Sequence, residues 1–161
     1  MITKINPEII ELDKNFQGIC KKPYHGHAKG CPNYGKRKDC PPNLSLLDDS
    51  LDFEKDMYLI YTSYPVGKFA ERMRKTHSEW TDRQIYNPRL WQPTARKKHR
   101  EEIQKFMEMH PKLYVETNAE ARGTNFTALM KTQGIDLNWQ WPPEHNLENI
   151  TYRISIGGMK K

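Results

Sequence analysis

All three cysteines of this chain lie in one short segment, and that segment most limits how the chain can fold. Cys20, Cys31 and Cys40 belong to the basic sequence CKKPYHGHAKGCPNYGKRKDC, which runs directly into a Pro-Pro pair. An odd number of cysteines cannot form a complete disulfide framework, and free structural cysteines prefer apolar surroundings to lysines. The clustering therefore favours a metal or iron–sulfur site over disulfides or ordinary core cysteines.

The spacing of the cysteines bears on which metal they would bind. Ten residues separate Cys20 from Cys31 and eight separate Cys31 from Cys40, whereas structural zinc sites usually contain at least one tight cysteine pair. Long spacings suit the separate iron corners of a [4Fe–4S] cluster, in which three thiolates leave one iron open to a histidine, a water or a substrate. We favour the cluster. Zinc is the alternative, because His25 or His27 could complete a Cys3His site.

The same segment is strongly basic, with Lys or Arg at positions 21, 22, 29, 36, 37 and 38 in a chain of net charge +6. Such a patch can attract nucleic acid through its phosphates. It can equally balance the charge of ligating thiolates and lower their pKa. We favour charge balance, because the basic residues do not form a stripe interleaved with aromatic residues. A nucleic-acid partner bound through this loop stays open as the alternative.

Hydrophobic patterning predicts the elements of an α/β fold: a small single-domain sheet with flanking helices and an N-terminal cysteine-rich metal loop. One domain would span 1–161, with the metal loop at 20–42 and the α/β body at 57–158. In the last strand, alternation predicts one buried face and one wet face, with Ser155 on the wet one. The expected elements are a helix over 7–16, a strand over 57–65, a helix over 69–80, a loop over 81–93, a helix over 93–109, a strand near 113–115, a short helix from 126 and a strand over 150–158.

The sequence also predicts where the protein resides. No apolar run approaches the roughly 20 residues needed to span a bilayer. The first residues, MITKINPEIIELDKNF, contain no signal-peptide core. We therefore expect a cytoplasmic protein with no membrane partner.

The sequence GCPNYGKRKDCPP resembles the signature of an uncharacterised family of predicted metal-binding proteins, a domain of unknown function. The resemblance continues in the middle of the chain and in the short helix near its C-terminal end. It implies a metal-binding loop and a similar fold, but no activity. The positions that match are Cys20, Cys31, Tyr34, Gly35, Lys36, Cys40, Pro41 and Pro42 in the loop, then Asn87, Trp91 and Gln92, and finally Gly134, Ile135 and Asp136.

Two departures from that family pattern affect the interpretation. The segment between Cys20 and Cys31 is longer than in many relatives and carries PYHGHAKG, which keeps His25 and His27 open as ligands. The second, ferredoxin-like cysteine group of some relatives is missing, which argues against a chain of several clusters that transfers electrons.

Three kinds of function fit these observations, and the sequence does not decide whether the protein is an enzyme. An open iron could act as a Lewis acid on a small-molecule substrate, in sulfur-related or lyase-like chemistry. Alternatively, zinc could stabilise a nucleic-acid-binding module, or a fourth ligand could complete a cluster for electron transfer. No catalytic residue is assigned. For the first function, the polar residues expected to line the pocket are Tyr34, Lys36, Asn87, Gln92, Glu120 and Arg122.

Overall fold

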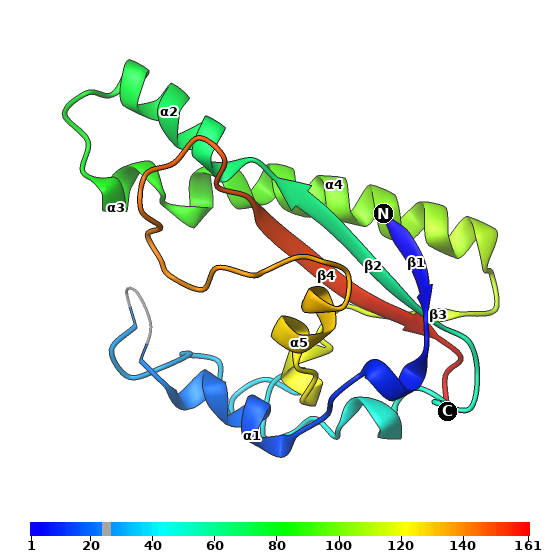
Figure 1. The fold of residues 1–161 in the computed structure, drawn as a ribbon. Helices are drawn as coiled ribbons and strands as arrows, with labels where there is room; N and C mark the ends of the chain where they lie inside the picture. The colour runs from blue at the N-terminus through cyan, green and yellow to red at the C-terminus, as the bar shows by residue number, and fades with distance from the viewer. Residues whose placement is uncertain (24–26) are drawn as a thin grey trace.

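The fold is built on a four-stranded sheet in which every neighbouring pair of strands is antiparallel. The computed structural model describes residues 1–23 and 27–161. The order of the strands is β1-β2-β4-β3, and the long central pair β2 and β4 is in register from Met57 opposite Gly158 to Tyr64 opposite Thr151. The strands are β1 (Ile2–Ile5), β2 (Met57–Tyr64), β3 (Tyr114–Glu116) and β4 (Thr151–Gly158). The expected mixed α/β class, a small sheet with flanking helices, is confirmed (Figure 1).

Helices cover both faces of this sheet (Figure 1). Along one face lies α4, whose Phe106 is fully buried against Ile60 and Val115. On the opposite face, Leu59 and Ile156 pack into a larger core with residues of the N-terminal segments and of α5. The helices are η1 (Pro7–Ile9), α1 (Lys14–Gln17), η2 (Gly18–Lys21), η3 (Leu47–Asp49), α2 (Val66–Thr76), α3 (Asp82–Ile85), α4 (Pro88–Met109), η4 (Glu120–Arg122) and α5 (Phe126–Lys131).

Ser155 is buried, so the prediction of a wet face at this end of β4 was wrong. The reason is that α4 covers the face of β4 that the alternating sequence pattern predicted to be exposed to solvent. His99 of α4 lies 2.8 Å from the Ser155 hydroxyl through Nε2 and 3.1 Å from the Thr62 hydroxyl through Nδ1. The serine therefore pairs with a buried imidazole rather than with water, and burial lowers the pKa of His99 to about 4.

Two predicted element boundaries were also wrong, and local side-chain caps explain both. The single helix expected over 7–16 is divided into η1 and α1, because Asp13 caps a new helix by accepting from the Asn15 amide at 2.8 Å. The loop expected over 81–93 contains α3 and the first turns of α4. Asn87 accepts from the Arg89 amide at 3.1 Å and Pro88 occupies the first helical position, so Pro93 lies inside the helix instead of opening it.

Strand β1 is absent from our predictions, although it completes the sheet. It pairs with β2 from Ile2 opposite Ile60 to Ile5 opposite Met57. The amino group of Met1 donates to the Tyr61 carbonyl at 2.7 Å and forms an ion pair with Glu102 of α4 at 2.6 Å. Four residues that alternate only weakly give little sequence signal for a strand, and the long-range pairing with β2 decides their conformation.

In the part of the chain that the structure describes, no helix is both long enough and apolar enough to cross a membrane.

Candidate functional site

Two of the three cysteines are placed side by side by the backbone. Cys20 lies in η2, and the amide of Cys31 donates a hydrogen bond of 2.7 Å to the Cys20 carbonyl. The close approach depends on Gly30, whose φ is +79°. A Cβ at this position would lie 2.6 Å from the Cys20 carbonyl oxygen and 2.7 Å from that of Lys21. The segments around 20 and 30 can therefore approach this closely only with glycine at position 30.

The third cysteine returns toward the first two through a series of turns. The Tyr34 amide donates to the Cys31 carbonyl at 3.2 Å, and the Gly35 amide donates to the Pro41 carbonyl at 2.8 Å. This second bond folds the chain back on itself directly after Cys40. All three cysteines are half-buried and free of disulfides.

The electrostatics of Cys20 show that the thiols converge. Burial raises the pKa of the Cys20 thiol, and the charges of Cys31, Glu120 and Cys40 raise it further, in that order. The Cys31 and Cys40 sulfur atoms and the Glu120 carboxylate therefore each lie within electrostatic range of Cys20.

The convergence is loose, however. Among the described residues, no group of three or more His, Cys, Asp or Glu side chains lies close enough together to hold one metal ion. The thiols thus share a region of the surface without forming the compact set of ligands that a single tetrahedral ion requires.

An open hollow of about 530 Å³ lies against Cys20 and Cys31. Three other candidates from the sequence, His27, Tyr34 and Lys36, also line it. The remaining lining residues are Lys21, Ala28, Lys29, Gly30 and Pro32. The expectation that the loop surrounds a ligand site therefore has a physical counterpart on the surface.

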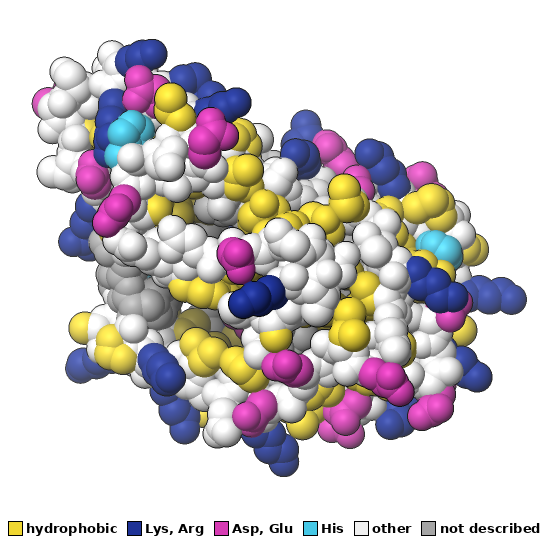
Figure 2. Space-filling model, in the orientation of Figure 1, with side chains coloured by type: hydrophobic (Ala, Val, Ile, Leu, Met, Phe, Trp, Pro, Cys, Tyr) yellow, Lys and Arg dark blue, Asp and Glu magenta, His cyan; other side chains and the backbone are white. Residues whose placement is uncertain are grey.

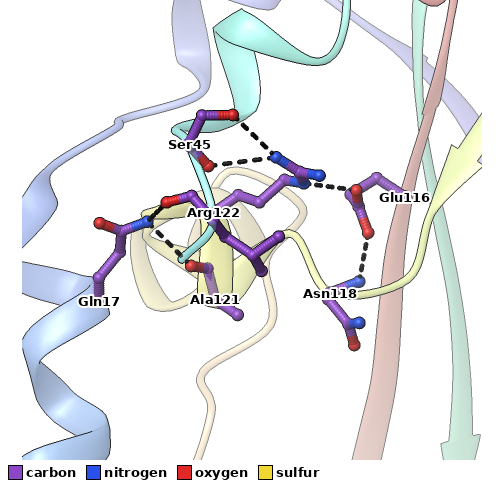
Figure 3. Close-up of polar contacts among 7 residues, drawn as sticks. Gln17, Ser45, Glu116, Asn118, Ala121 and Arg122 are labelled. Carbon is purple, nitrogen blue, oxygen red and sulfur yellow. Dashed lines mark hydrogen bonds and ion pairs between the residues drawn. The ribbon is translucent and has the colours of Figure 1, made fainter. Parts of the chain in front are cut away.

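A polar network anchors the cysteine segment to the rest of the fold (Figure 3). The side-chain amide of Gln17 donates to the Leu44 carbonyl at 2.9 Å and to the Ala121 carbonyl at 3.1 Å. Arg122 donates to the carbonyl and hydroxyl of Ser45 at 3.2 and 3.1 Å. The residues that directly follow the Cys-Pro-Pro sequence are thus fixed between α1 and η4.

Arg122 also holds a buried carboxylate. Its Nε lies 2.6 Å from Glu116 Oε2, and the side chain of Glu116 is only 6% exposed. The other carboxylate oxygen accepts from the Asn118 amide at 2.9 Å. The structure therefore uses Arg122, which we expected to line the pocket, as a structural link between the sheet and the cysteine segment.

Glu120 differs from its neighbour Arg122 in its surroundings. The residue as a whole is exposed, yet the protein atoms around its carboxyl group disfavour the charged form and raise its pKa. This combination is typical of a concave surface, where water reaches a side chain that protein otherwise surrounds. The charge of Glu120 also acts on Cys20, so Glu120 lies near the cysteine region; its role in lining a substrate pocket stays a prediction.

Asn87 and Gln92 belong to a different part of the molecule. Asn87 caps α4, and Gln92 accepts from Arg96 at 2.8 Å on the same helix. In Figure 1 the start of α4 lies at the upper left and the cysteine segment at the lower left, with the connection from α5 to β4 between them. The structure therefore does not bring these two residues to the cysteines. His25 lies outside the described residues.

Several residues that shape this region were missed by sequence reasoning. Lys21 and Lys29 were noted in the sequence as part of the basic run, but only as charges that balance the thiolates. Gly30 was not singled out, although a glycine directly before Cys31 can indicate a backbone conformation that other residues disfavour. Gln17 gave no signal, because it acts through partners distant in the sequence, such as Ala121. Glu116 also gave no signal, because nothing in a short strand marks one carboxylate as the buried partner of Arg122.

Comparison with known proteins returned no matching family model, no matching curated protein and no matching solved structure. The class that fold and site define is thus a mixed α/β protein with an antiparallel sheet and a cysteine-rich basic loop anchored at its side. The family resemblance of that loop stays a prediction.

Proposed function

We propose that Cys20, Cys31 and Cys40 bind a [4Fe–4S] cluster with one iron left open, and that the protein uses this site on a small molecule in sulfur-related or lyase-like chemistry. One observation supports the proposal most: backbone hydrogen bonds bring three half-buried thiols into one loop region, where the charges of Cys31 and Cys40 act on Cys20. A cubane presents its iron corners well apart, which suits thiolates that come from separate turns of one loop.

The chemistry of the donor set fits a cluster in a second respect. The three thiols are half-buried rather than fully buried, so a preformed cluster or its components can reach them. The basic residues of the same segment can balance the negative charge of thiolates once these are bound, whereas burial raises the pKa of the Cys20 thiol in this structure. When bound, the open iron would supply a Lewis acid for an oxygen or sulfur atom.

The residues of the hollow would hold the substrate beside the cysteines. Tyr34 and Lys36 line the hollow and can donate to a polar substrate. Glu120 is the nearby carboxyl group whose surroundings disfavour its charged form, as a group that holds a proton near a reacting molecule would require. These three residues bind, orient and exchange protons; Arg122 acts through the loop that it anchors.

Substitution of each cysteine tests the proposal. Anaerobic reconstitution should give about four iron and about four sulfide per chain. Cys20→Ser, Cys31→Ser and Cys40→Ser should each lower both contents strongly, while Lys38→Gln, an exposed position in the same loop, should retain them. Three cysteine variants with the same iron and sulfide as the parent protein would refute the ligand assignment.

A zinc-stabilised nucleic-acid module is the second candidate, and the position of His27 favours it. His27 lines the same hollow as Cys20 and Cys31, where an imidazole could join the thiolates. This candidate predicts one zinc per chain, no sulfide, and affinity for nucleic acid that falls steeply with salt. An electron-transfer protein would instead show a cluster whose fourth ligand no added small molecule displaces.

A further inference from the structure

The hollow beside the cysteines is strongly cationic. Lys21, Lys29 and Lys36 line it, and none of its described lining residues is acidic. Figure 2 shows Lys and Arg side chains at the lower left of this face of the molecule, over the cysteine segment, whereas over α1 they are mixed with Asp and Glu side chains. A concave surface with one sign of charge concentrates ligands of the opposite sign.

The three lysines are not neutralised within the protein. In the described part of the chain, no carboxylate forms an ion pair with any of them, whereas Arg37 in the same loop forms a two-point pair with Asp39 at 2.9 and 3.0 Å. Lys21 lies over the ring of Tyr34, with its Nζ 5.1 Å from the ring centroid. That contact fixes the direction of the ammonium group without cancelling its charge.

A bound cluster would not balance this charge either. The iron–sulfur core is itself cationic, so a cluster held by three thiolates carries less negative charge than the thiolates alone. Three lysines therefore exceed what the cluster needs, and the excess charge lines the space beside it.

We propose that the hollow binds a small molecule through an oxyanion, a carboxylate or a phosphate, with Lys21, Lys29 and Lys36 as its counter-charges. This inference deepens the proposed function and rests on it for the role of the anion as a substrate. The charges bind the anionic end, and Tyr34 and Cys20 also line the hollow.

The shape of the hollow favours a small molecule over nucleic acid. All its described lining residues come from one segment rather than from a long basic stripe. Among these described residues the one phenol ring, that of Tyr34, is half-buried and has a lysine over it, so it offers little free face for a stacked base.

Calorimetric titration of the reconstituted protein tests the inference, with succinate and inorganic phosphate as separate probes. We expect at least one of them to bind, and Lys21→Gln and Lys36→Gln each to weaken binding about tenfold, the effect of one charge-assisted contact. Lys38→Gln removes the same charge from the same loop outside the hollow and should change affinity less than about twofold. Binding of succinate alone identifies a carboxylate ligand, and binding of phosphate alone a phosphate ligand.

Three results would overturn the inference: no binding of either probe, equal weakening by Lys38→Gln, or displacement of the probe by a short single-stranded oligonucleotide that binds more tightly. Iron and sulfide are measured in every sample. Anion binding that persists in a protein without iron would refute the cluster and leave the anion site standing. Full iron and sulfide content without anion binding would refute the anion site and leave the cluster standing.

Discussion

Replacement of Gly30 by alanine tests the backbone geometry that brings Cys20 and Cys31 together. With φ at +79°, an alanine would pay about 1 to 2 kcal/mol for the left-handed conformation. Its Cβ would lie 2.6 Å from the Cys20 carbonyl oxygen. Since Cβ contacts under 3.0 Å are essentially never observed, this oxygen would have to move away by about 0.4 Å. That movement weakens the hydrogen bond from the Cys31 amide, worth about 1 kcal/mol. We therefore expect Gly30→Ala to destabilise the protein by about 3 kcal/mol.

Gly35→Ala is a matched control in the same loop. Gly35 has φ at +70°, but the nearest atom to a Cβ there is Pro42 Cδ at 3.9 Å, so the substitution carries the conformational cost without the clash. Urea unfolding should show a loss of about 1 to 2 kcal/mol for the control, which is the conformational cost alone. Iron content after reconstitution should fall for Gly30→Ala and stay near the parent value for Gly35→Ala. If both variants lose the same stability and the same iron, the close approach does not control the site.

Three further predictions concern the body of the fold. Because burial lowers the pKa of His99 from 6.5 to about 4, the imidazole stays neutral in the folded protein between these pH values, whereas it is protonated in the unfolded chain. Stability present above pH about 6.5 should fall by about 3 kcal/mol as the pH drops to about 4, and urea unfolding of His99→Gln should show a much flatter pH profile. Arg122→Gln should cost about 3 kcal/mol, because it leaves the Glu116 carboxylate buried without a counter-charge; if adding Glu116→Gln recovers no stability, the ion pair is not the cause. Gly157→Ala should cost about 2 kcal/mol in thermal unfolding, because its Cβ would lie 2.5 Å from Phe106 Cζ, and a companion Phe106→Leu that restores nothing would argue against this clash.

The parts of the fold that were predictable are those in which local pattern and tertiary packing agree. The apolar, β-branched run of β2 and the periodic apolar positions of α2 and α5 identified these elements from sequence. The errors arose where distant partners decide the outcome. Strand β1 exists because β2 offers an edge, and Ser155 is buried because α4 covers it.

The cysteines of the candidate site could be named from the sequence, but which other residues lie near them could be predicted only in part. Three thiols within one short loop had to lie near one another, and the structure brings Glu120 to them. Asn87 and Gln92 were placed at the site because they resemble a motif, but their side chains belong to α4. Arg122 lies near the loop, but its guanidinium donates to both Glu116 and Ser45 and so ties the loop to the sheet. Sequence proximity and residue type cannot show which of several partners a side chain selects.

The central claim is that three cysteines of the basic loop hold an iron–sulfur cluster with one open iron. Mössbauer spectroscopy of the anaerobically reconstituted protein, with iron and sulfide analysis of the same sample, tests it most directly. We expect about four iron and about four sulfide per chain, and one iron whose spectrum changes on its own when a small ligand is added. One zinc per chain without sulfide, or four irons that all respond alike, would contradict it.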